Sequence, residues 1–123
     1  MEGVSRIEST VEDWITTMPA DFSADACFLK NVVQYFGEEY VFAILLPALK
    51  MHTATGGCVA IETFTKLPVP PFDTHMTTFS ADALTSRFED WNIIFRSERK
   101  QEGKDMKGKM RTFYLTQVIA QRQ

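Results

Sequence analysis

Residues 25–36 read DACFLKNVVQYF and residues 58–66 read CVAIETFTK, and these two stretches decide the fold of the chain. Each holds a short apolar run without strict alternation, which is typical of a strand covered on both faces. Between them, residues 40–53 carry apolar side chains at helical spacing, and Gly56 with Gly57 indicates a return to the sheet. The order strand, helix, strand predicts a parallel α/β sheet, with Pro47 kinking or splitting the helix.

Polar residues follow both predicted strands. Ligands of parallel sheets bind beyond the carboxyl ends of the strands, and these ends are predicted at Lys30 and Asn31 and at residues 63–66. The six glycines of the chain form no G-x-G-x-x-G and no shorter G-x-G motif. Because a backbone that approaches a nucleotide cofactor closely needs glycine at that turn, the sequence predicts no glycine-rich cofactor loop.

The remaining segments extend the sheet. Residues 4–11 predict a short strand, and the proline-rich residues 67–78 predict an extended connection that cannot be a central strand. Ser80 is a good helix cap. Trp91, Ile93 and Phe95 predict one apolar face of a strand that pairs in an antiparallel hairpin with residues 111–121. We therefore expect one domain over residues 1–123.

Composition excludes several classes of partner. Hydrophobic residues make up 45% of the chain, charged residues 24%, and the net charge of −3 does not favour nucleic acid. Acids interrupt the basic residues 96–109, which predicts a solvated hairpin. No apolar run is long enough to span a membrane, and no signal peptide is visible, so we expect a cytoplasmic protein. Cys27 and Cys58 are expected to be reduced core thiols rather than a disulfide or metal pair.

These pieces, in this order, resemble the C-terminal half of class I S-adenosylmethionine (SAM)-dependent methyltransferases, especially the tellurite-resistance and thiopurine methyltransferases. Residues 25–36 resemble the fourth strand and the helix start after it, and Gly56 with Gly57 resembles the glycine pair before the fifth strand. Residues 79–84 and 88–94 resemble the next helix and the sixth strand, with the hairpin to the seventh. The resemblance implies a partial Rossmann-like sheet with equivalents of strands three to seven and a C-terminal antiparallel hairpin. The family's first strand and glycine-rich loop have no counterpart.

The resemblance also implies candidate site residues. Asp13 and Trp14 are similar to the position that approaches the adenine of SAM, although a solvated acid at a strand end and a tryptophan that covers the core also explain them. Lys30 and Asn31 lie where the transferred methyl group would be, and Asn31 also suits a turn cap. His75 is a weak candidate for a general base. Asn31 is a weak candidate for a residue that contacts the substrate. Two isolated histidines predict no metal site.

Without the first two strands, the fourth strand becomes an edge with unpaired backbone groups. We therefore expect a truncated or degenerate methyltransferase-like domain for which SAM binding by the chain alone is doubtful. A homo-oligomer, a complementing N-terminal half, or residues 4–11 would cover the edge. The alternatives are a small binding or assembly module that uses the strand ends or the exposed edge, and a cone-shaped α+β fold with a mainly antiparallel sheet around a pocket.

Overall fold

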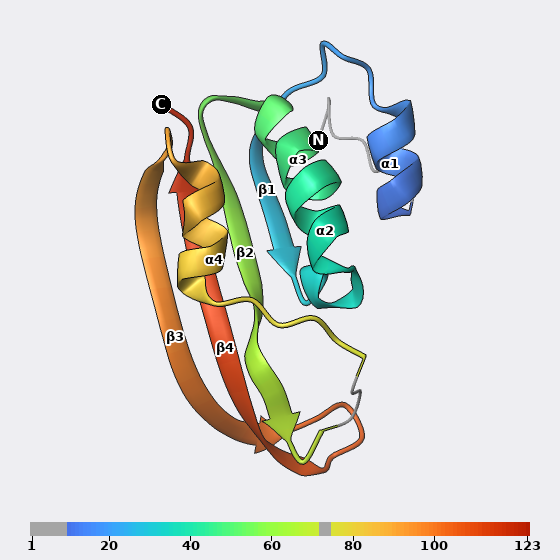
Figure 1. Cartoon of the computed structure of the whole chain (residues 1–123), viewed down its shortest axis with the longest axis vertical. Coiled ribbons are helices and arrows are strands. Elements are labelled where there is room, and N and C mark those ends of the chain that lie inside the picture. The colour runs from blue at the N-terminus through green and yellow to red at the C-terminus, as the bar shows by residue number, and fades with distance from the viewer. Residues whose placement is uncertain (1–9, 72–74) are drawn as a thin grey trace, which may run out of the picture.

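The computed structural model describes residues 10–71 and 75–123. Its sheet has four strands in the order β1-β2-β4-β3, formed by Ala24–Lys30, Thr53–Val69, Met110–Gln121 and Asn92–Lys104 respectively. β1 pairs with β2 in parallel, whereas β4 is antiparallel to both β2 and β3. The predicted parallel pair and the C-terminal hairpin are therefore confirmed, and β1 forms one edge of the sheet (Figure 1).

The helices cover one face of this sheet (Figure 1). The segment between β1 and β2 consists of a 3₁₀ turn at Val33–Tyr35, α2 at Glu38–Tyr40, a π-helical turn at Val41–Leu45 and α3 at Leu46–Met51. After β2, α4 at Ala81–Thr85 and a 3₁₀ turn at Ser86–Phe88 lie over β3 and β4. Side chains from both of these helical segments pack in one core against four residues of the sheet: Val59, Ile61, Val118 and Ala120.

Pro47 explains the irregular helix. Proline has no N–H to donate to the carbonyl four residues earlier, and its ring crowds that carbonyl. Just before it, the amide of Leu46 donates to the carbonyl of Val41, five residues back, which is the π-helical pattern. At the place where a kink or a split is predicted, the helix therefore forms a π-helical turn.

β2 is longer than predicted. It begins at Thr53 and runs through Gly56 and Gly57, so the glycine pair lies inside the strand and does not end the helix. It also contains Pro68, although residues 67–78 are predicted to lie outside any central strand. β1 ends opposite Glu62, so beyond that point β2 has a strand neighbour on the β4 side only, and a strand edge tolerates proline.

The N-terminal prediction is only partly testable. Residues 4–9 of the predicted strand lie outside the described residues, but Val11 begins α1 at Val11–Thr17 rather than ending a strand. Thr10 caps this helix, because its hydroxyl accepts the amide of Asp13 at 3.1 Å. The helix ends at Thr17, before Pro19. Ser80 caps α4 in the same way, by accepting the amide of Ala83 at 3.1 Å.

The prediction of one apolar face on β3 is wrong. A bulge separates Ile93, which pairs with the buried Ala120, from Phe95, which pairs with Ile119. Residues paired across strands point to the same face, so the bulge turns Ile93 toward the helices and Phe95 toward the opposite face of the sheet.

Candidate functional site

The carboxyl end of β1 forms a sharp turn. Asn31 has a φ of 56°, in the left-handed region that asparagine tolerates, and its amide donates to the carbonyl of Glu62 at 3.0 Å. Its side chain is exposed. Residues 63–66, the other predicted strand end, lie within β2, which runs on to Val69. Of the two strand ends that were predicted to lie side by side, only the end of β1 is therefore found where the sequence predicts it.

Trp14 and Asp13 lie on α1. Trp14 is half-buried, contacts the edge of the His52 ring at a centroid distance of 6.1 Å, and borders a hollow with Cys27 and Leu29. The Asp13 side chain is exposed in the first turn of the helix. His52 is the C-cap residue of α3. Its Nδ1 lies 2.8 Å from the carbonyl oxygen of Phe22, and this contact gives the buried ring a structural role.

Lys30 lies on the opposite face of the sheet. Along β1, Phe28 and Lys30 point away from the helices, whereas Leu29 belongs to the core. Asp13, Trp14, Lys30 and Asn31 consequently do not line one common hollow. These residues therefore do not, by themselves, fit the outline of a cofactor site. His75 is exposed in the connection after β2 and borders neither of the two hollows described here. The roles assigned to all five residues remain predictions.

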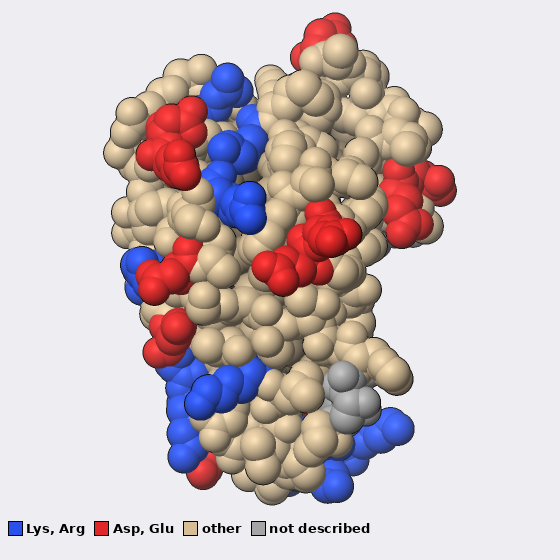
Figure 2. All heavy atoms as spheres, viewed as in Figure 1, with Lys and Arg blue, Asp and Glu red and all other residues tan. Residues whose placement is uncertain are grey.

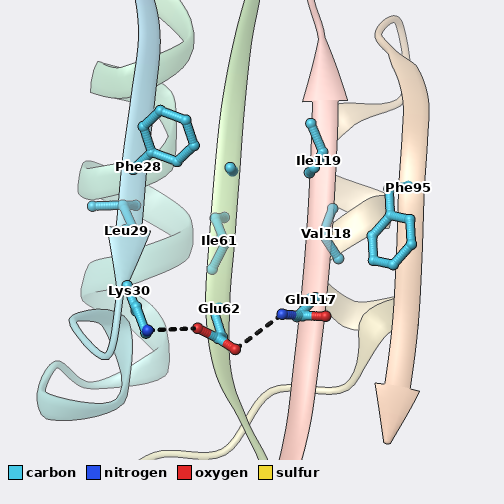
Figure 3. Close-up of a pocket in the computed structure, with 10 residues that line it drawn as sticks. Phe28, Leu29, Lys30, Ile61, Glu62, Phe95, Gln117, Val118 and Ile119 are labelled. Atoms are coloured by element: carbon cyan, nitrogen blue, oxygen red, sulfur yellow. Dashed lines mark hydrogen bonds and ion pairs between the residues drawn. The ribbon is translucent and has the colours of Figure 1, made fainter.

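A row of apolar side chains crosses the face of the sheet that lacks helices in the described chain. The register aligns Phe28 with Ala60, Ala60 with Ile119, and Ile119 with Phe95, one residue from each strand. Phe28 is 78% exposed and Phe95 46%. The two rings stand at either side of a shallow hollow (Figure 3). The volume of this hollow is about 220 Å³. We call these four residues the apolar row.

A polar row runs beside the apolar row. Glu62 accepts a hydrogen bond from Nε2 of Gln117 at 2.9 Å, and its carboxylate lies 3.9 Å from the Lys30 ammonium (Figure 3). The same carboxylate lies 3.9 Å from the Arg99 guanidinium. Ser97 donates to Oε1 of Gln117 at 3.3 Å. Exposed ion pairs of this length stabilise little, so this row contributes mixed charge at the rim of the hollow rather than much stability.

Sequence reasoning missed this surface. Phe28 lies within an apolar run that predicts a strand covered on both faces. Glu62 was the available signal, because a carboxylate in the middle of an otherwise apolar strand indicates that one face is not fully covered.

Cys27 and Cys58 are free thiols, and burial raises the pKa of Cys27. Residues 10–71 and 75–123 hold no group of three or more metal-ligating side chains, and their helices are too short to cross a membrane. Acidic and basic side chains are intermixed over the helical face, with basic ones gathered toward the hairpin end (Figure 2).

Comparison with known proteins identifies the fold. No protein-family model and no curated protein matches the chain. Among solved structures, TehB from Haemophilus influenzae matches with a TM-score of 0.67 and 20% identity, over 84% of this chain and 37% of TehB. A SAM-dependent methyltransferase from Anabaena variabilis matches with a TM-score of 0.57 and 13% identity, over 78% of this chain and 48% of that one.

A third structure comes from work on the conversion of a disulfide bond into a thioacetal group during echinomycin biosynthesis. It matches with a TM-score of 0.58 and 16% identity, over 84% of this chain and 50% of that chain. This chain thus spans half or less of the length of these three structures. At these identities the likeness concerns the fold alone. Over the four strands that the structure describes, the chain has a methyltransferase-like, partial Rossmann-like α/β fold.

Proposed function

We propose that this chain is a truncated or degenerate SAM-dependent methyltransferase-like domain, of the tellurite-resistance and thiopurine kind, that does not hold SAM unaided. The observation that carries the proposal is the position of Trp14 and Lys30 on opposite sides of the sheet, because it separates residues that the resemblance assigns to one cofactor site. The match of 84% of this chain to TehB supports the methyltransferase-like fold of the domain. The free cysteines favour the cytoplasm as its location.

Isothermal titration calorimetry tests this proposal directly. We expect no saturable heat when SAM or its demethylated product is titrated to millimolar concentration into the folded chain. The Anabaena variabilis methyltransferase, titrated in the same buffer, is the positive control, and circular dichroism establishes that the chain is folded. Saturable binding to the chain alone would contradict the proposal, because it would require a complete cofactor site within these residues.

The apolar row favours a second candidate function. A Phe ring that is 78% exposed beside a hollow is unusual for a surface that meets only water, and such surfaces mark interaction sites. The domain then acts as an assembly module that binds a partner through the face of the sheet opposite the helices. This candidate does not depend on SAM.

A further inference from the structure

The two faces of the sheet differ in cover. Core side chains of β2 and β4 contact the helices on one face, whereas the apolar row lies on the other, which we call the bare face. A sheet buries its apolar face against another layer in stable folds, and two sheets can supply that layer for each other. We therefore expect the bare face to be buried by another layer that also carries apolar side chains.

The bare face carries both a projecting ring and a hollow. Phe28 projects at the edge, opposite Phe95 across the hollow (Figure 3). Ala60, the smallest side chain of the row, pairs with Phe28 and lines the hollow. A surface that offers a knob and a hole together is complementary to itself. Such a surface suits a two-fold interface, in which the same patch of each copy makes the contact.

The charges at the rim are compatible with this arrangement. Lys30 and Arg99 are cationic, and Glu62 between them is anionic. When two copies of the rim meet, the carboxylate of each copy comes near cations of the other. A rim of a single sign would repel its copy, whereas this mixed rim is complementary to it.

We propose that two copies of this chain pack bare face to bare face, about a two-fold axis parallel to the strands between β2 and β4. This rotation lays β1 of one copy over β3 of the other, so that Phe28 covers the partner's Phe95 and Ala60 covers the partner's Ile119. Two twisted sheets packed in this way keep their strands within about 30° of each other. The inference rests on the second candidate function and is independent of SAM binding.

Light scattering coupled to gel filtration tests the dimer. At micromolar concentration we expect a mass of twice the 14.0 kDa of one chain. F28K should reduce the mass to that of one chain, because it removes a ring from the apolar contact and would bury an unpaired ammonium between the two sheets. The substitution should leave the fold intact, since Phe28 is largely exposed in the single chain. I44K is the matched control, because Ile44 is also exposed but lies in the helical layer.

Two more variants test the geometry. F95K should dissociate the dimer as F28K does, and F28K combined with F95E should restore it, because the two charges then face each other across the axis. A single-chain mass for the unchanged protein would overturn the proposal and leave the bare face to a complementing N-terminal half. A dimer that survives F28K would also overturn it. Loss of the dimer in F28K but not in F95K would overturn it in favour of pairing along the β1 edge.

Discussion

At the scale of single residues, Gly57 shows how tightly β1 and β2 approach. A Cβ at this position would lie 2.8 Å from the carbonyl oxygen of Asp25 and 2.9 Å from that of Ala54. Its neighbour Gly56 has a φ of 82°, a backbone conformation that residues with a side chain rarely adopt. The glycine pair in the sequence therefore reflects the geometry of the parallel strand pair, and the conformation of one residue and the crowding of the other both require glycine.

Replacing Gly57 with alanine should consequently destabilise the fold. We expect G57A to lower the free energy of unfolding by about 1–3 kcal/mol, the usual cost of forcing an extra methyl group into a packed site. Urea denaturation measures this. G103A is the control, because Gly103 lies in β3 with no atom near its added Cβ, and its change should stay within about 0.5 kcal/mol. Equal losses in both variants would show that the approach of β1 to β2 is looser than described.

The sequence suggested candidate residues but not how the fold groups them. Trp14 and Lys30 are candidates by their type and by their places along the chain, and their roles stay predictions. The sequence could not show that α1 places Trp14 on the helical side while the alternation of β1 turns Lys30 to the bare face, because Val11, predicted to end a strand, begins the helix that carries Trp14.

At the scale of elements, the turn between β3 and β4 is held by one carboxylate. Asp105 accepts the amides of Lys107 and Lys109 at 2.8 and 2.9 Å and Nε of Arg111 at 2.6 Å. The Arg111 guanidinium also donates to the carbonyl of Pro70, just beyond the end of β2. Asp105 and Arg111 thus tie the hairpin turn to the far end of the central strand.

Because of this tie, the stability of the folded chain should depend on pH. The hydrogen bond from Arg111 and those from the turn amides hold the pKa of Asp105 below its ordinary value of 3.8. A carboxyl whose pKa is lowered by folding stabilises the folded state above its ordinary pKa, and the benefit disappears as the pH falls through the lowered value. We expect D105N to be less stable than the unchanged chain at neutral pH and to lose less stability between neutral and acid pH.

Thermal melts across this pH range measure the effect. The control is E102Q, which removes an exposed acid from the same hairpin. If E102Q reduced the acid dependence as much as D105N does, the loss would come from general charge and not from the tie between the turn and β2.

The elements themselves were largely predictable, and their irregularities were not. Apolar runs at strand and helix spacing were enough to predict the β1–helix–β2 unit, since they are local patterns, whereas the glycine pair lies inside β2 and does not mark its start. The bulge between Ile93 and Phe95 was not predictable, because three consecutive apolar residues leave the facing of the strand undetermined. That bulge moves Phe95 onto the bare face and so completes the apolar row.

At the scale of the whole molecule, the parallel pair leaves its first strand, β1, at an edge of the described sheet. The amide of Asn31 donates to Glu62, and in a parallel ladder the bonds to one neighbour come from alternate residues. The amides of Cys27 and Leu29 therefore point toward β2, whereas those of Ala26, Phe28 and Lys30 point away from it. Packing two copies face to face covers the bare face and leaves this edge unpaired.

Residue-resolved hydrogen exchange of β1 tests this arrangement most directly. In the chain alone, we predict slow exchange for the amides of Cys27 and Leu29 and fast exchange for those of Ala26, Phe28 and Lys30. Fast exchange at all five amides would show that β1 does not pair with β2, which would contradict the methyltransferase-like sheet. Slow exchange at all five would show that another strand covers the edge, and β1 would then not be the open side of this fold.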